Sequence, residues 1–157
     1  MSNTQLVIEH AERLCRSHGT RLTEKRRQVL TGLISSEKAL SAYELVDFCK
    51  TQLGHSIPVM TVYRILDFLQ VENLVHRLNL TNKYVACSHI ACDHAHEVPQ
   101  FLICNRCGKV KEIGIKKSVV DTLMASVEQA GYFLNNSQLE LNCLCQSCAN
   151  SSFHEAQ

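Results

Sequence analysis

The segment "PVMTVYRILDFLQVENLVHRLNLTNKYVAC", residues 58–87, joins a helical pattern to two short strand-like runs. Its first part begins with a proline, which the first turn of a helix tolerates, and continues with apolar residues at helical spacing. The runs at 74–80 and 83–87 are joined through Thr81 and Asn82, and asparagine readily adopts the backbone conformations of tight turns. The segment therefore predicts a helix followed by a β-hairpin.

Three further helices are expected before this segment. Residues 5–18 place apolar side chains on one helical face, and Thr23 is a favourable N-cap for a second helix. Ser41, with Glu44 three residues later, forms a capping box for a third helix, which ends near Gly54. Helices followed by a hairpin predict a winged helix-turn-helix, whose second motif helix enters the DNA major groove. From the order of elements alone, an ordinary small α+β domain remains the alternative.

The second half of the chain predicts a mixed α/β unit. "FLIC" and "KVKEIGI" indicate strands on either side of "CNRCG", and another strand leads into the last cysteine pair. Between them, residues 116–131 predict a helix that stops at Gly131. Four of its apolar residues are expected to face inward: Val119, Val120, Leu123 and Val127. The whole chain is therefore expected to be of the α+β class.

The composition favours a folded, cytoplasmic protein. No apolar run approaches the roughly 20 residues of a membrane span, and the first ten residues lack the pattern of a signal peptide. Residues 1–87 carry 11 Lys and Arg against 8 Asp and Glu, whereas residues 88–157 carry 5 against 7, so the first part is mildly basic. In a reducing compartment, the nine cysteines favour metal binding over disulfides.

Two Cys-x-x-Cys pairs predict a structural zinc site. They are separated by 37 residues and consist of Cys104 with Cys107 and Cys145 with Cys148. Each pair can direct both sulfurs at one ion from a tight turn, and the second pair completes a tetrahedral shell. A redox-active pair of the thioredoxin type is the alternative, but it needs a βαβ setting that the pattern does not show. Cys143 is an extra thiol that could replace Cys145 as a ligand.

A second group of candidate ligands begins on the hairpin and continues beyond it. Its members are His76, Cys87, His89, Cys92, His94, His96, Glu97 and Glu112. A site of mixed nitrogen, sulfur and oxygen donors suits Zn²⁺ better than iron, because a thiolate favours the softer ion. A closed site without an open coordination position is structural or sensory rather than catalytic. His89, Cys92 and His94 could form an additional site or none.

Enzymatic motifs are absent or incomplete. The H-E-x-x-H motif of zinc proteases does not occur. "HAHE" with "ICNRC" approaches the zinc deaminase signature, but His96 stands where that signature needs glutamate, and no proline precedes Cys104. Gly-rich phosphate loops and Gly-x-Ser-x-Gly elbows are also missing. We therefore expect a protein that is not an enzyme and has no small-molecule substrate.

Several segments together resemble a known family. "RLTEKRRQVL", "SAYELVDFC", "PVMTVYRILDFL", "VHRLNLTNKYVAC", "FLICNRCGKVKE" and "LCQSC" are similar to the ferric-uptake-regulator family, and most of all to its zinc-responsive branch. The resemblance implies a homodimeric, zinc-dependent repressor of zinc-uptake genes that binds double-stranded operator DNA. It also implies a winged-helix DNA-binding domain in 1–87, a metal-ligand-rich hinge in 88–97 and an α/β dimerisation domain in 98–157.

The resemblance further implies two zinc ions per chain. The structural ion would be bound by Cys104, Cys107, Cys145 and Cys148. The regulatory ion would be bound by His76, Cys87, His96 and Glu112. Cys87 distinguishes the zinc branch from iron- or peroxide-responsive members, which remain alternatives together with a thiol redox switch. The connection before "FLIC" is one residue longer than the family pattern, so His94 is an alternative ligand to His96.

The residues expected to contact DNA lie mainly on the predicted helices of the first half. Arg64 is expected to read a guanine through bidentate hydrogen bonds, and an ion pair with Asp67 is its alternative role. Side chains expected on the same surface are Tyr43, Thr61 and Tyr63, and the two tyrosines are expected to meet phosphate or a thymine methyl group. The cations expected to contact phosphates are Arg21, Lys25, Arg26 and Arg27. Asp47 and Lys50 could pair between neighbouring dimers or simply face solvent.

Overall fold

A computed structural model describes residues 2–91, 99–135 and 138–154 of the chain. The chain divides into two compact units, Met1–Asp93 and His94–Gln157. None of the described helices is both long and apolar enough to cross a membrane.

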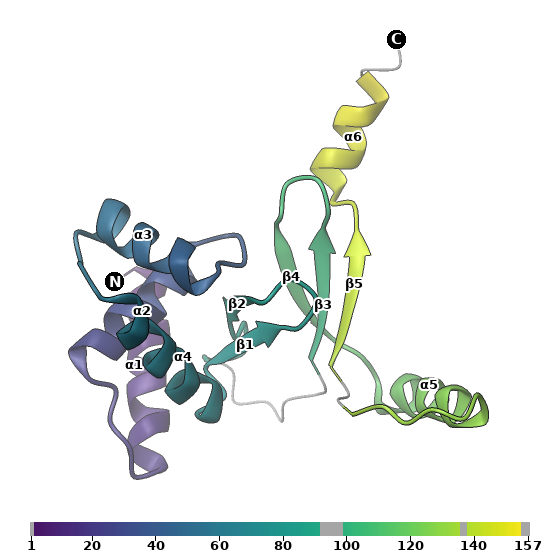
Figure 1. Cartoon of the computed structure of the whole chain (residues 1–157), viewed down its shortest axis with the longest axis horizontal. Coiled ribbons are helices and arrows are strands. Elements are labelled where there is room, and N and C mark those ends of the chain that lie inside the picture. Colours follow the sequence, from purple (N-terminus) through teal and green to yellow (C-terminus); the bar gives the residue numbers. More distant parts are fainter. Residues whose placement is uncertain (1, 92–98, 136–137, 155–157) are drawn as a thin grey trace. The chain divides into compact units, whose positions relative to one another are not determined.

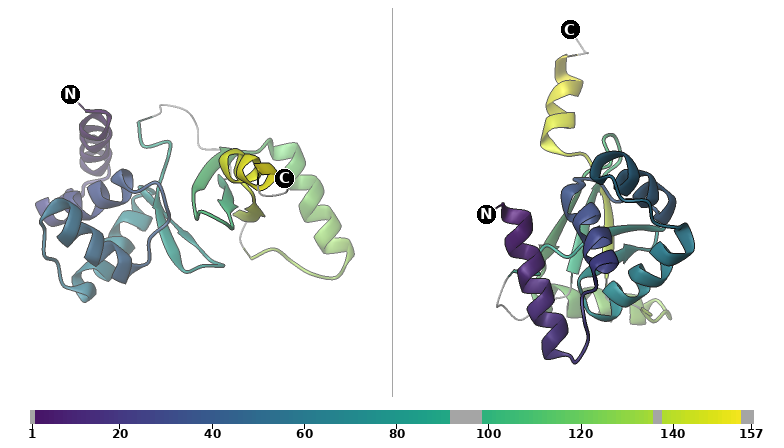
Figure 2. Two further views of the ribbon diagram at one scale, coloured as in Figure 1. Left: turned by 90° about the horizontal axis from the view of Figure 1, so that it is seen from above. Right: turned by 90° about the vertical axis from the view of Figure 1, so that its left-hand side faces the viewer.

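The first unit combines four helices with a two-stranded hairpin (Figure 1). Its elements in chain order are α1 (Asn3–Ser17), α2 (Glu24–Ser35), α3 (Ala42–Leu53), α4 (Val59–Val71), β1 (Val75–Leu78) and β2 (Lys83–Ala86). The helices gather into one bundle, and the hairpin extends from it (Figure 2). This arrangement is the winged helix-turn-helix that the sequence predicts.

The helix boundaries follow local capping chemistry. The Thr23 side chain accepts a hydrogen bond from the backbone N–H of Arg26 at the start of α2. At α3, the hydroxyl of Ser41 accepts from the N–H of Glu44 while the carboxylate of Glu44 accepts from the N–H of Ser41. Gly54 ends α3 with φ 71°, a left-handed conformation that glycine adopts without steric cost. These three predictions are confirmed.

The core of the first unit lies between its helices. On α4, the predicted inward residues Val62, Ile65, Leu66 and Leu69 are all buried. Arg64 and Asp67 on the opposite side of α4 are exposed. Cys15 and Cys49 are fully buried in this core, which confirms them as small apolar residues.

The hairpin has the predicted turn and an additional attachment to the bundle. Val75 pairs with Ala86 and Leu78 with Lys83, and Asn82 adopts φ 54° in the connection. Beyond the predicted pairing, Leu40 and Tyr84 exchange two backbone hydrogen bonds of 3.1 and 2.8 Å. This single-residue bridge ties the hairpin to the segment before α3. Because this bridge leaves no repeating pattern in the sequence, it was not predicted.

In its described residues, the second unit is a three-stranded sheet with two helices (Figure 1). Its elements are β3 (Pro99–Cys104), β4 (Val110–Gly114), α5 (Lys117–Gln129), β5 (Leu139–Cys143) and α6 (Gln146–His154). The strand order is β4-β3-β5, with β4 antiparallel and β5 parallel to the central strand. The predicted α+β class is confirmed. Helix α6 was not predicted, because a short polar segment has no apolar periodicity.

One prediction about α5 is wrong for the single chain. Of the four residues expected to face inward, only Val120 is buried, while Val119 is 54% and Leu123 is 37% exposed. Helical spacing correctly places these side chains on one apolar face. However, a small sheet gives that face little to pack against, so most of it stays open to solvent.

Candidate metal centre

The topology of the second unit brings the two Cys-x-x-Cys pairs together. Strands β3 and β5 are parallel neighbours, and Cys104 lies opposite Cys143 at their ends. The residues that follow each strand therefore leave the sheet at the same edge. Cys107 lies in the turn after β3, Cys145 directly precedes α6, and Cys148 lies in the first turn of α6. The long-range pairing of β5 with β3 thus brings the two cysteine pairs close together, as a short loop does in a simple zinc finger.

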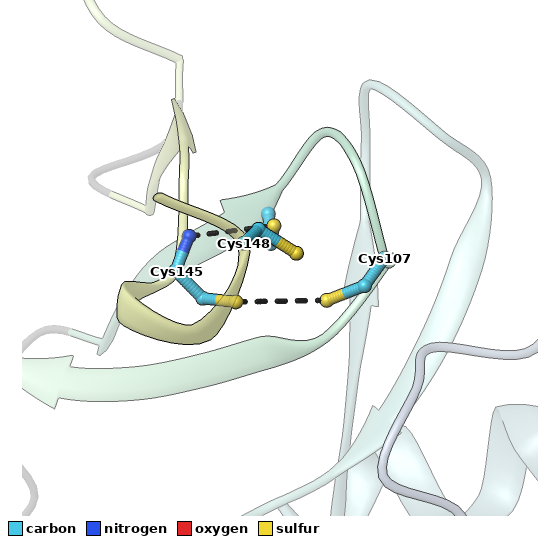
Figure 3. Close-up of side chains that lie close together, drawn as sticks. Cys107, Cys145 and Cys148 are labelled. Atoms are coloured by element: carbon cyan, nitrogen blue, oxygen red, sulfur yellow. Dashed lines mark hydrogen bonds between the residues drawn. The ribbon is translucent and has the colours of Figure 1, made fainter. Parts of the chain in front are cut away.

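The sulfur atoms of Cys104, Cys107, Cys145 and Cys148 lie within 4.8 Å of one another. The sulfurs of Cys107 and Cys145 are 3.7 Å apart, and the Cys148 side chain lies beside them (Figure 3). Four thiolates grouped in this way form the donor set of a tetrahedral structural zinc site. The residues present therefore fit Zn²⁺.

Backbone groups prepare Cys104 for the thiolate form. The N–H of Cys145 donates to Sγ of Cys104 at 3.4 Å, and with the N–H groups of Cys107 and Arg106 it lowers the pKa of Cys104 to about 5. The neighbouring Cys145 side chain, by contrast, raises the pKa of Cys148 to about 12. Four adjacent thiols cannot all ionise alone, but a divalent cation among them displaces the remaining protons.

The position of Cys143 bears on an alternative that the sequence leaves open. Cys143 is the last residue of β5, and its carbonyl accepts a hydrogen bond from the N–H of Asn105. The sulfur group found among the described residues includes Cys145 and not Cys143. The register of β5 therefore favours Cys145 as the ligand.

A second pair of ligand atoms lies on the hairpin of the first unit. His76 on β1 pairs with Val85, and Cys87 lies two residues beyond Val85, so His76 and Cys87 share one face of the hairpin. One ligand atom of His76 and the sulfur of Cys87 lie within 4.8 Å of each other. Cys87 is buried, and its N–H donates to the carbonyl of Leu74 at 2.9 Å. Backbone pairing therefore fixes a nitrogen and a sulfur donor side by side.

The structure describes the positions of only some of the other candidate ligands. Glu112 is half-buried on β4, and His89 is half-buried after the hairpin. Cys92, His94, His96 and Glu97 lie outside the described residues, as does most of the predicted hinge. Their ligation stays a prediction.

Some of the predicted DNA-contacting residues are exposed, and others are partly buried. Arg64 is exposed on α4, and within the described chain it forms no ion pair with Asp67. Tyr43 is 68% exposed in the first turn of α3. Tyr63 is half-buried and packs partly against the core, and Thr61 is also half-buried. Arg64 and Tyr43 are therefore the most accessible members of the set on these two helices.

The predicted phosphate-binding cations differ in their surroundings. Arg26 lies over the ring of Phe68, 3.6 Å from its centroid, and donates to the carbonyl of Arg21 at 2.7 Å. Arg27 forms an ion pair with Glu12. Lys25 is exposed, and Arg21 is exposed at the edge of a cavity of about 510 Å³ between α1 and α2. Arg26 thus has a packing role in addition to the predicted phosphate contact.

Comparison with known proteins identifies relatives along nearly the whole chain. The Ferric uptake regulator family profile matches residues 17–142. The Zinc uptake regulation protein of Escherichia coli (strain K12) is 35% identical over 147 residues, which cover 94% of this chain and 84% of that protein. A Ferric uptake regulation protein of Helicobacter pylori is 28% identical over 112 residues, which cover 71% of each chain.

Solved structures agree with this similarity. A zinc uptake regulator complexed with zinc and DNA has a TM-score of 0.82 and 32% identity, and the match covers 98% of this chain and 99% of that one. The crystal structure of holo XcZur has a TM-score of 0.73 and 36% identity, with coverage of 91% and 96%. With its winged helix, its four-cysteine cluster and these relatives, the chain belongs to the ferric uptake regulator family.

Proposed function

We propose that the chain is a zinc-dependent transcriptional repressor that controls zinc-uptake genes. As a homodimer, it binds double-stranded operator DNA when its regulatory site holds zinc. Its family consists of transcription regulators rather than enzymes, and its zinc-regulator relatives include one whose structure contains zinc and DNA. A regulator of this kind acts on DNA in the cytoplasm.

The observation that carries the zinc specificity is the paired His76 and Cys87 on the hairpin. A thiolate beside an imidazole favours Zn²⁺ over Fe²⁺, because iron sites of this charge type prefer nitrogen and oxygen donors. Burial of Cys87 keeps this thiol away from solvent oxidants, which disfavours a redox switch at this position. The pair is therefore better suited to sensing zinc than iron or peroxide.

Two further ligands would complete this regulatory site. We assign them to Glu112 and to His96, with His94 as the alternative to His96. Bound zinc would tie the hairpin to residues of the second half of the chain. Zinc can favour DNA binding only by its higher affinity for the binding-competent arrangement. With the four-cysteine site, the expected content is two zinc ions per chain.

Exposed apolar side chains of the second unit support a homodimer. Tyr132 and Phe133 are 71% and 80% exposed, and Val119 and Leu123 on α5 are also exposed. Large apolar side chains left exposed in one unit are typical of a surface that a partner covers. A second copy of the chain would cover it, and the resulting two-fold pair would present two α4 helices to successive major-groove faces about 34–36 Å apart.

Stepwise removal of zinc tests the proposal. Zinc per chain and DNA affinity would be measured while a graded series of chelators lowers free zinc. We expect one ion to leave first, together with DNA affinity, while a folded dimer keeps the other. Cys87→Ser is expected to lose only the first ion, whereas the matched variant Cys143→Ser should keep both. Loss of a single ion only on unfolding, or DNA affinity that does not depend on zinc, would contradict zinc sensing.

The DNA contact of Arg64 has its own test. Arg64→Ala is expected to weaken specific DNA binding by about 1–3 kcal/mol and to relax the base preference at one position of each half-site. Arg13→Ala, which removes another exposed arginine from α1, is the matched control for lost charge. If both variants lose the same affinity on specific and random DNA, Arg64 acts as a charge and does not read a base.

A further inference from the structure

The outward face of α4 contains an apolar residue at its beginning. At 100° per residue, Met60, Arg64 and Asp67 project on one side of the helix, opposite the buried face of Val62, Ile65, Leu66 and Leu69. Met60 is 63% exposed, although it is long and apolar. It lies one helical turn before Arg64, on the same side.

The position of Met60 distinguishes it from an ordinary exposed apolar residue, which by itself needs no explanation. Residues near the N-terminus of a recognition helix contact base edges. Met60 is the second residue of α4, so it is nearer to that end than Arg64. A docking that inserts the N-terminal end of α4 into the major groove therefore brings Met60 there together with Arg64.

The chemistry of the groove selects one target for this side chain. Base edges there present hydrogen-bond donors and acceptors, and the thymine C5-methyl is the apolar group among them. The methionine side chain has no strong donor or acceptor, and its flexible thioether adapts to small apolar contacts. Four helical residues span about 6 Å, and the base-pair rise is about 3.4 Å. The contact therefore falls within about two base pairs of the base that Arg64 reads.

We propose that Met60 is a specificity-determining residue that contacts a thymine methyl group in each operator half-site. This inference rests on the proposed DNA-binding function. It adds an apolar contact to the polar one expected from Arg64, so the two residues together would read two nearby base pairs.

Replacing single thymines by uracil tests the proposal, because uracil lacks only the methyl group. Duplexes would first be selected from a random pool with the zinc-loaded full-length protein. Each thymine of the selected half-site would then be exchanged for uracil in turn. For the wild type, we expect one position at which the exchange weakens binding about fourfold per half-site, the ratio that corresponds to one buried methyl-sized group.

The variants decide whether Met60 makes this contact. Met60→Ala should lose about the same factor on thymine DNA and show no further loss on uracil DNA at that position. Alanine is a good helix former at an exposed position, so the fold should persist, as circular dichroism would verify. Met60→Gln should instead shift the preference at that position towards adenine, which glutamine recognises.

Val71→Ala is the matched control. Val71 is 78% exposed on the same side of α4, but at its far end, and this variant should keep the full sensitivity to uracil. If Met60→Ala keeps the wild-type sensitivity at every thymine, the proposal is wrong. If the wild type selects no duplex at all, the proposed function fails as well, and this result appears before any variant is compared.

Discussion

The two units differ in how much apolar core they contain. In the first unit, all four helices contribute fully buried residues, among them Val29, Leu45 and Leu66. In the second unit, Phe101 is the fully buried large apolar side chain among the described residues, and α5 contributes only Val120. Small folds with little core depend on metal ions or oligomerisation. The four-cysteine cluster lies in this second unit, where a bound metal ion would add stability that the small core does not supply.

The largest expected effect comes from breaking this cluster. Cys145→Ser removes one of the four proposed ligands, and structural zinc contributes about 10–16 kcal/mol of apparent binding free energy that is coupled to folding. We expect the variant to lose this zinc and the second unit to unfold, while the helices of the first unit persist. Zinc content and far-ultraviolet circular dichroism would measure both effects.

Cys143→Ser is the control for this experiment, since Cys143 lies two residues earlier and outside the sulfur group. It should keep the zinc ion and the fold. If Cys145→Ser keeps the second unit folded and only Cys143→Ser unfolds it, then β5 has a different register when metal is bound.

The next effect concerns the apolar cores themselves. Leu66→Ala should lower the free energy of unfolding of the first unit by about 2–5 kcal/mol, because it leaves a cavity in a close-packed core. Leu123→Ala on α5 should cost less than about 1 kcal/mol in dilute protein, because this side chain is already 37% exposed. Urea unfolding measures both. Equal costs would show that α5 packs against a well-formed core, which would contradict the proposed difference in apolar core between the two units.

Features determined by local chemistry could be predicted from the sequence. The capping box of Ser41 and Glu44 and the stop at Gly54 follow from short-range rules and are confirmed. The Leu40–Tyr84 bridge could not be predicted, because a single paired residue has no periodicity. The exposed face of α5 was misjudged for another reason, since periodicity identifies an apolar face but not what covers it.

In the candidate sites, too, some features follow from local sequence and others depend on long-range strand pairing. Cys-x-x-Cys spacing predicts four candidate ligands by itself, but the preference for Cys145 over Cys143 depends on the long-range pairing of β5 with β3. The same holds on the hairpin, where His76 and Cys87 are adjacent only because of the strand register. The contribution of His96 lies outside the described residues and stays a prediction.

A smaller effect tests a polar contact in the first unit. Nδ1 of His18 at the end of α1 lies 2.7 Å from a carboxylate oxygen of Glu72 at the end of α4, and the Glu72 side chain is only 6% exposed. His18→Ala should lower the free energy of unfolding by about 1–2 kcal/mol, because it leaves a buried carboxylate with one partner fewer. In the double variant with Glu72→Gln, this cost should shrink, as urea unfolding would show. An unchanged cost would mean that His18 contributes through packing alone.

The smallest effect concerns Glu44, which joins the start of α3 to the hairpin. Burial raises the pKa of its carboxyl, but hydrogen bonds from Ser41 and Lys83 outweigh burial, so the pKa lies below its ordinary value. Such a group stabilises the fold above its unfolded-state pKa, and this stabilisation is lost as the pH falls through the folded-state pKa. Glu44→Gln should therefore cost about 0.5 kcal/mol at neutral pH and less at about pH 3. Thermal unfolding at both pH values measures the difference. A cost that is the same at both would assign the role of Glu44 to side-chain geometry in the capping box rather than to its charge.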